Sequence, residues 1–169
     1  MAKEWSSNNE LPAEQILRIT KQYGLWNCPI CQGEYSYRIE DRYVGDNSCP
    51  YCNNQKPLTG YNTLETVLDN IDLIWSSAND RHYTELLPSS SYNAEWKCNI
   101  CNGFYKETVN SFIKKHLSGE DDCPYCKNRK PLAGFNTLKV KCQNLMKEWN
   151  YRSNYLIVDP DTILPTYPE

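Results

Sequence analysis

The chain has 169 residues, nine of them cysteine, and a formal net charge of −3. No apolar run reaches the length of a membrane span, no signal-like segment follows Met1, and the net charge alone does not indicate nucleic-acid binding. Tyr (13) and Trp (5) supply much of the hydrophobic content, so small modules that need staples are expected rather than one large core. We expect a cytoplasmic protein, in which cysteines hold metal and disulfides are the alternative.

The first predicted unit opens at Trp5 and leads through a loop to a short strand ending at Trp26. A Cys-x-x-Cys turn and a strand with alternating aromatics follow, and then the stretch CPYCNNQKPLTGYNTL at 49–64. Gly60 is expected in a turn that a side chain would obstruct. A helix is predicted next, capped by Asn62 or Thr63. Its apolar face is spaced for a helix and comprises Leu64, Val67, Leu68, Ile71 and Trp75.

The same order of features recurs from Trp75 onward. Residues 123–138 read CPYCKNRKPLAGFNTL, identical to 49–64 at 12 of 16 positions, and Gly134 takes the place of Gly60. The first cysteine pair recurs 70 residues later and the second 74 later, so four residues are inserted between the pairs. The stretch VNSFIKKHL at 109–117 fits a short amphipathic helix.

Repetition therefore predicts three parts of the chain. Residues 1–74 form a first zinc-binding repeat and residues 75–148 a second. Residues 149–169 are a partial third start, because EWNYRSN at 148–154 resembles IWSSAND at 74–80, followed by a tail. This part has no cysteine and is expected to cap the second repeat.

The cysteine spacing is C-x2-C-x17-C-x2-C in the first repeat and C-x2-C-x21-C-x2-C in the second. Two such pairs on adjacent turns place four sulfurs around one ion, and four thiolates favour Zn²⁺. We predict two structural zinc ions, whose binding energy is largely folding energy. The predicted ligands are Cys28, Cys31, Cys49, Cys52, Cys98, Cys101, Cys123 and Cys126.

Two features of the cysteines allow other interpretations. The stretch WNCPIC resembles a thioredoxin-type redox motif, but such a motif begins a helix after a strand in a βαβ unit, and the doubled pairs fit metal better. Cys142 aligns with Leu68 on the apolar helix face, so it is expected to be a small buried hydrophobe. A fifth ligand or a reactive thiol is the alternative for Cys142.

The repeated motifs resemble the zinc-ribbon or treble-clef repeat domains found in tandem in bacterial and viral proteins. The resemblance rests on CPYC with GYNTL or GFNTL and on the tryptophans, and it covers residues 3–165. It implies a small α+β fold, with two tandem four-cysteine modules that each consist of a β-hairpin with zinc knuckles followed by a helix. It also implies a nucleic-acid-binding role, although the first repeat is acidic and no nuclease domain is present.

The charges separate the two repeats. Residues 5–74 contain 5 basic and 9 acidic side chains (−4), whereas residues 75–148 contain 11 and 8 (+3). We therefore expect DNA or RNA to bind mainly through the second repeat. The candidate contacts are Lys114, Lys115, Lys127, Arg129 and Lys130. Tyr125 and Phe135 lie nearby as stacking candidates, with a role in the small core as the alternative.

A second hypothesis is a protein-interaction module, for example a phage or mobile-element inhibitor that docks on a basic nucleic-acid-processing protein. An enzyme is not expected. The two histidines, His82 and His116, do not recur between repeats, and no catalytic triad, phosphate-binding loop or open metal site is visible. Asp121 and Asp122 are expected to form a loop turn within the four-residue insertion.

Overall fold

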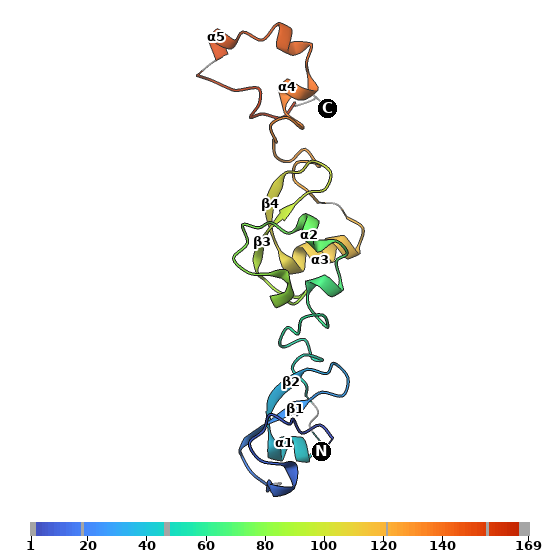
Figure 1. Ribbon diagram of the computed structural model, residues 1–169. Helices are drawn as coiled ribbons and strands as arrows, with labels where there is room; N and C mark the ends of the chain where they lie inside the picture. The colour runs from blue at the N-terminus through green and yellow to red at the C-terminus, as the bar shows by residue number, and fades with distance from the viewer. Residues whose placement is uncertain (1–2, 18, 46–47, 121, 155, 166–169) are drawn as a thin grey trace. The chain divides into compact units, whose positions relative to one another are not determined.

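The computed structural model describes residues 3–17, 19–45, 48–120, 122–154 and 156–165 (Figure 1). By its internal contacts the chain divides into two compact units. The first comprises Met1–Asp69 and Arg81–Pro88, and the second comprises Asn70–Asp80 and Ser89–Glu169. Each unit contains one antiparallel hairpin, and the elements around the two hairpins follow the same order.

The hairpins are the centre of each unit (Figure 1). Strand β1 (Tyr23–Asn27) pairs with β2 (Glu34–Arg38), and β3 (Asn93–Lys97) pairs with β4 (Phe104–Thr108). Trp26 lies opposite Tyr35, and Trp96 lies opposite Tyr105. Both tryptophans are almost fully buried. The predicted strands are thus confirmed, and each first strand ends one residue beyond its tryptophan.

A helix follows each hairpin directly. Helix α1 (Ile39–Tyr43) follows β2, and α3 (Val109–Leu117) follows β4 with the predicted bounds 109–117. Val109 and Ile113, one helical turn apart, are buried, while the lysines of α3 lie in its last turn, where cations favour the helix dipole.

The segment that opens each repeat pairs with the first strand of the hairpin through one isolated bridge. Trp5 bridges to Trp26 in antiparallel fashion, and Trp75 does the same with Trp96. The indole rings meet edge to face, with centroids 5.0 and 5.1 Å apart, a favoured aromatic geometry. Asn79 fixes the second segment to β3, since its side chain accepts from Glu95 N–H (2.8 Å) and donates to Glu95 C=O (3.0 Å).

The side chain that packs on the ring of the buried tryptophan differs between the two units. In the first unit the Arg42 guanidinium lies 5.6 Å from the Trp26 ring and pairs with Glu4. In the second unit Phe112 stacks on Trp96, with ring centroids 3.7 Å apart and planes 4° apart. Ile74 stands where the repeat would place Glu4, so an ion pair in one unit is replaced by apolar side chains in the other.

The prediction of a single long helix after Thr63 is wrong. A 3₁₀ turn, η2 (Leu64–Thr66), is followed by a separate helix, α2 (Ile71–Ile74). Asn70 lies between them with φ 56°, a left-handed conformation that interrupts a right-handed helix. Thr63 occupies the N-cap position of η2 without a side-chain capping bond. The second unit is interrupted likewise, with α4 (Leu138–Lys141) and η4 (Leu145–Lys147).

The remaining elements are short. They are η1 (Ala13–Gln15), η3 (Tyr83–Glu85) and α5 (Tyr151–Asn154). Turn η3 contacts η2, and the adjacent Leu86 is buried. In the second unit the backbone N–H groups of Leu138 and Lys139 donate to Ile163 C=O and Pro160 C=O (2.9 and 3.1 Å).

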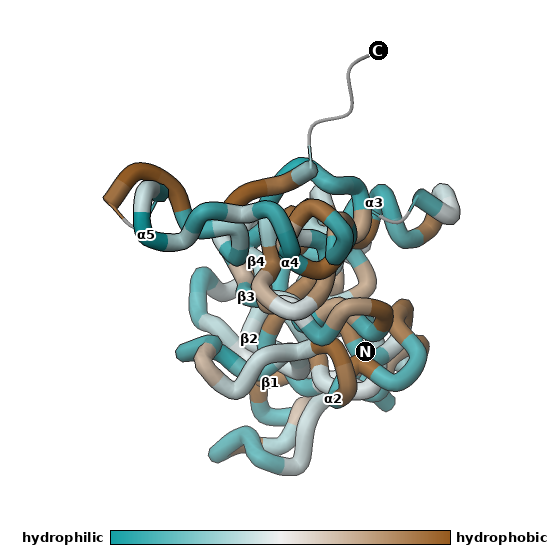
Figure 2. Tube along the Cα trace, turned by 90° about the horizontal axis from the view of Figure 1, so that it is seen from above, coloured by the Kyte–Doolittle hydropathy of each residue, from teal (hydrophilic) through white to brown (hydrophobic). Residues whose placement is uncertain are grey.

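The chain after α5 carries exposed apolar side chains, Leu156 and Ile157. In Figure 2 the trace beside α5 includes a brown, hydrophobic arc. Among the described residues, none of the helices combines the length and apolar character that crossing a bilayer requires.

Candidate metal centres

The first cysteine pair of each unit lies in the turn of the hairpin. Cys28 follows β1, its N–H donates to Gly33 C=O (3.0 Å), and its carbonyl accepts from Gln32 N–H (2.9 Å). Gln32 has φ 61°, which turns the chain back into β2. Cys98 makes the same two bonds, with Gly103 and Asn102.

The second pair lies in a compact turn beyond the helix. Asn53 N–H donates to Cys49 C=O (3.1 Å), and Gln55 N–H donates to Pro50 C=O (2.8 Å). Asn54, with φ 52°, closes this turn. The equivalent turn at Cys123 and Cys126 repeats these bonds, and Asn128 takes φ 51°. Both CPYC motifs therefore present their sulfurs from a fixed backbone.

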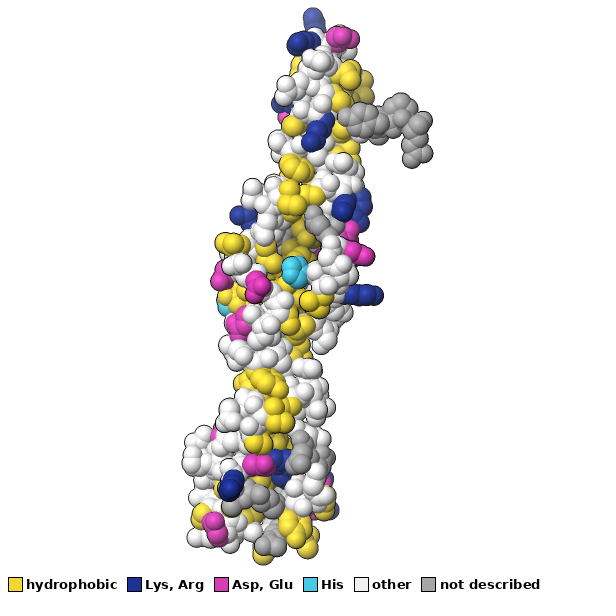
Figure 3. Space-filling model, turned by 90° about the vertical axis from the view of Figure 1, so that its right-hand side faces the viewer, with side chains coloured by type: hydrophobic (Ala, Val, Ile, Leu, Met, Phe, Trp, Pro, Cys, Tyr) yellow, Lys and Arg dark blue, Asp and Glu magenta, His cyan; other side chains and the backbone are white. Residues whose placement is uncertain are grey.

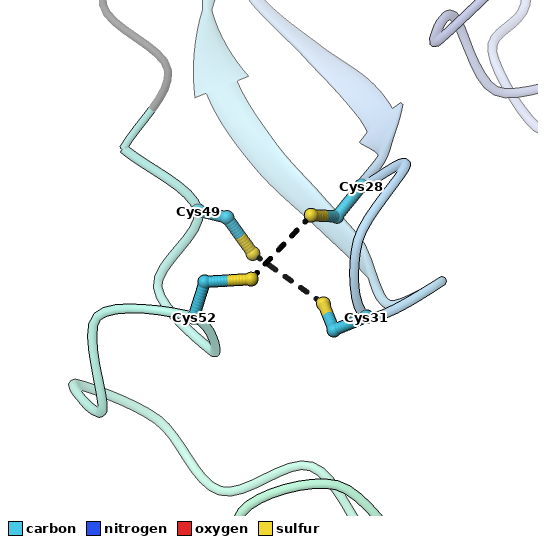
Figure 4. Close-up of side chains that lie close together, drawn as sticks. All are labelled: Cys28, Cys31, Cys49 and Cys52. Carbon is cyan, nitrogen blue, oxygen red and sulfur yellow. Dashed lines mark hydrogen bonds between the residues drawn. The ribbon is translucent and has the colours of Figure 1, made fainter.

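The two pairs converge into one tetrad of sulfurs in each unit. Figure 4 shows the first, in which Cys28 Sγ is 3.6 Å from Cys52 Sγ and Cys31 Sγ is 3.6 Å from Cys49 Sγ. The corresponding distances in the second unit are 3.6 and 3.7 Å. The sulfurs of each tetrad all lie within 4.8 Å of one another.

These distances fit a tetrahedral metal site. Four sulfurs at about 2.3 Å from a central zinc are about 3.8 Å apart, close to the observed spacing. A disulfide requires sulfurs about 2.05 Å apart, so the pairs are not cystines. Each tetrad thus accepts one ion through four ligands, and the chain holds two structural zinc ions. The tetrads contain the eight cysteines predicted as ligands.

The environment of the thiols explains why all four ionise only when a cation is bound. Burial is the main cause that raises the pKa of Cys31 to about 12 and that of Cys101 to about 11. Four neighbouring thiols resist full ionisation because their charges repel one another. A dication removes this opposition, since cysteine binds zinc as thiolate.

A buried asparagine supports each second turn. Asn136 is 1% exposed; its side-chain oxygen accepts from Leu132 N–H (2.7 Å), and its amide donates to Tyr125 C=O (2.8 Å) and Lys130 C=O (2.9 Å). Asn62 makes the equivalent bonds in the first unit. Instead of capping a helix, this repeated asparagine ties the chain beyond CPYC back onto the metal turn.

The glycine of the repeated GYNTL and GFNTL motifs takes the predicted turn, for a different reason than expected. Gly60 and Gly134 have φ +75° and +77°, yet a Cβ there would meet nothing within 4 Å. The backbone conformation, rather than obstruction of a side chain, favours glycine at these positions.

A tyrosine packed against a glycine closes each site, and sequence reasoning missed this pair. A Cβ on Gly103 would lie 2.6 Å from the Tyr125 ring, and one on Gly33 would lie 2.6 Å from the Tyr51 ring. The hydroxyl of Tyr125 donates to Phe104 C=O (2.7 Å), which joins the CPYC turn to β4. The recurrence of Gly33 as Gly103 was the available signal. Tyr125 therefore acts within the module core, the alternative to base stacking.

Of the cations predicted to contact nucleic acid, two are engaged within the chain. Lys115 pairs with Glu107 and Asp122, and Arg129 pairs with the same Asp122. Its bond with Lys115 is the main cause that lowers the pKa of Asp122. Asp122 therefore anchors α3 to the second cysteine turn, whereas Asp121, the other residue of the predicted loop turn, lies outside the described residues.

The other three candidates, Lys114, Lys127 and Lys130, are exposed and make no ion pair with any residue that the structure describes. Cys142 lies at the end of α4, half-buried and outside both tetrads.

Comparison with known proteins agrees with this architecture. A family model described as "Probable Treble clef zinc finger domain" matches residues 1–55 and 75–129, more than half of the chain. An uncharacterized protein, R635, of Acanthamoeba polyphaga mimivirus is 27% identical over 144 residues, which cover 82% of this chain and 35% of that protein. The chain thus spans about a third of this relative's length. With two hairpins, two four-cysteine tetrads and both repeats matched, the chain belongs to the treble clef zinc finger family.

Proposed function

We propose that the chain is a non-enzymatic zinc module that binds nucleic acid through its second repeat. The supporting observation is the change of two aligned positions after CPYC, where Asn53 and Gln55 of the first repeat become Lys127 and Arg129. Lys127 is exposed and makes no ion pair in the described part of the chain, so its charge is available to phosphate.

The intramolecular ion pairs narrow the proposed contact surface. Lys115 and Arg129 are balanced by Glu107 and Asp122, so this network contributes little net charge. The surplus charge of the surface comes from Lys114, Lys127 and Lys130. In the view of Figure 3, cationic side chains are dispersed rather than gathered into one continuous face, which favours a few phosphate contacts over an extended groove.

The zinc ions support this proposal as scaffold rather than as catalysts. Four sulfurs complete a tetrahedral coordination, which leaves no open position for a substrate or a water. The tetrad fixes the turn that carries Lys127 and Lys130, so the cations are presented on a rigid backbone. Rigid presentation lowers the ordering cost that flexible lysines would otherwise add on binding.

Binding should be measured by fluorescence anisotropy with DNA and RNA oligonucleotides across a salt series. Lys127→Asn restores the residue of the first repeat, and combining it with Lys130→Asn removes two surplus charges. We expect weaker binding and a slope of log K against log salt that is shallower by roughly 0.7 to 0.9 per lost phosphate contact.

The matched control is Lys56→Asn, which removes the first-repeat counterpart of Lys130. It should leave affinity and slope nearly unchanged. An unchanged slope in the double variant, or an equal effect of Lys56→Asn, contradicts the assignment to the second repeat. Arg129 is left intact because its loss would also disturb the bond with Asp122.

The acidic first repeat favours a second candidate, a module that docks on a basic protein. Its formal charge of −4 becomes about two units more negative when four thiolates hold one zinc. Capture experiments after nuclease digestion separate the two functions. A basic partner that is retained without nucleic acid and released by salt supports docking, whereas loss of all binding after digestion supports the nucleic-acid function.

A further inference from the structure

The two zinc tetrads differ at one repeated position, Tyr61 in the first and Phe135 in the second. The Tyr61 hydroxyl donates to Cys52 Sγ over 3.4 Å. Phe135 has no hydroxyl, and Lys141 Nζ lies 5.7 Å from its ring centroid instead. Cys126, the counterpart of Cys52, thus lacks this donor.

Exposure further restricts which sulfurs a reagent can reach. One cysteine from each pair is buried: Cys28, Cys49, Cys98 and Cys123. The other four ligands are half-buried.

Three of these four half-buried sulfurs accept a hydrogen bond. Cys101 Sγ accepts from Gly103 N–H (3.4 Å), Cys31 has the equivalent backbone bond from Gly33, and Cys52 has Tyr61. Cys126 Sγ has no N–H or O–H donor in the described part of the chain, and its polar neighbours are the other sulfurs of its tetrad, of which Cys98 Sγ lies 3.6 Å away. It is therefore the accessible ligand with the least stabilised charge.

Hydrogen bonding to a thiolate spreads its negative charge and lowers its tendency to attack an electrophile. Hydrogen bonds to an ionised group are stronger than neutral ones, so the presence or absence of one donor changes a rate measurably. The thiolate, and not the thiol, is the nucleophile, and zinc keeps its ligands in that form.

We propose that Cys126 is the reactive thiolate of this chain, so that soft electrophiles modify it first and the second tetrad loses its zinc before the first. With a maleimide, the sulfur lone pair attacks one carbon of the ring double bond and a C–S bond forms. The π electrons move onto the imide, and the neighbouring carbon then takes a proton from water. The product is a thioether, which is a weaker zinc ligand than a thiolate. This proposal is independent of nucleic-acid binding.

The test uses the full zinc-loaded chain with Cys142→Ala, which removes the one cysteine outside the tetrads. N-ethylmaleimide is added, modified peptides are quantified by mass spectrometry over time, and a chromophoric chelator records zinc release. We expect Cys126 to react roughly tenfold faster than Cys52, the change that about 1.4 kcal/mol of barrier produces. The first kinetic phase should release one zinc per chain.

Two exchanges taken from the chain itself separate the hydroxyl from other differences, such as Lys127 beside Cys126. Tyr61→Phe should accelerate modification of Cys52, and Phe135→Tyr should slow that of Cys126. Native mass spectrometry confirms first that each variant binds two zinc ions. Equal rates at Cys52 and Cys126, earlier modification of Cys31 or Cys101, or no response of Cys52 to Tyr61→Phe would overturn the proposal.

Discussion

Replacing Asn136 with alanine tests whether the buried asparagine holds the second metal turn. The side chain makes three bonds of 2.7 to 2.9 Å, to Leu132, Tyr125 and Lys130, in a position that is 1% exposed. At about 1 kcal/mol net for each bond, the loss should destabilise the turn by roughly 3 kcal/mol. Because 1.4 kcal/mol corresponds to about tenfold, protection of the Leu132 amide from exchange should fall roughly a hundredfold.

Hydrogen–deuterium exchange of the zinc-loaded chain measures this effect locally. Leu58, whose amide donates to Asn62 Oδ1 in the first unit, is the internal reference and should keep its protection. Ala133→Thr, which introduces the first-repeat residue at an exposed position, should change neither amide. Protection of Leu132 within threefold of the unmodified chain after Asn136→Ala would show that the turn is held by the metal alone.

Three further outcomes are expected. Gly103→Ala should destabilise the second unit and lower the thermal midpoint, because the added Cβ lies 2.6 Å from the Tyr125 ring; a midpoint equal to that of the parent chain contradicts this packing. Phe112→Ala should cost about 3 kcal/mol in urea unfolding, since it removes the stack on Trp96, and a loss below about 1 kcal/mol would contradict that role. Zinc affinity, measured by chelator competition, should fall as pH decreases. The pKa of Cys31 is raised to about 12, so protons compete with zinc for this sulfur throughout the neutral range. An affinity that does not depend on pH contradicts thiolate ligation.

The cysteine tetrads were predictable because the two Cys-x-x-Cys motifs identify the ligands without any knowledge of the backbone between them. Two Cys-x-x-Cys turns specify four ligands whether 17 or 21 residues separate them, and the repeat fixed which cysteines belong together. The helix of residues 109–117 was equally predictable, since its apolar positions recur at helical spacing and nine residues suffice to show the period.

The interrupted helix after Thr63 could not be predicted from the same pattern. Of the predicted apolar face, Leu64, Leu68 and Ile71 are buried, whereas Val67 is exposed. The apolar spacing therefore indicated burial of part of this segment but not one continuous helix. In the first repeat the left-handed Asn70 lies within the break, whereas its counterpart Asn144 is right-handed although the second repeat is interrupted too. The residue type at this position therefore does not predict the break. The engagement of Lys115 and Arg129 by Asp122 was also hidden, because it depends on how the four inserted residues return to the cysteine turn.

The division of the chain into Met1–Asp69 with Arg81–Pro88, and Asn70–Asp80 with Ser89–Glu169, has a consequence for how such arrays can grow. A gene duplication that copies one full period supplies every segment that a unit needs, wherever the copied stretch begins. Duplication therefore does not have to respect the limits of a folded body. Truncation does: a chain cut between Ile74 and Trp75 leaves the first unit without Arg81–Pro88 and the second without Asn70–Ile74. Repeat number can thus increase by duplications with arbitrary end points, whereas a fragment that contains the whole first unit must extend at least 14 residues past that cut, to Pro88.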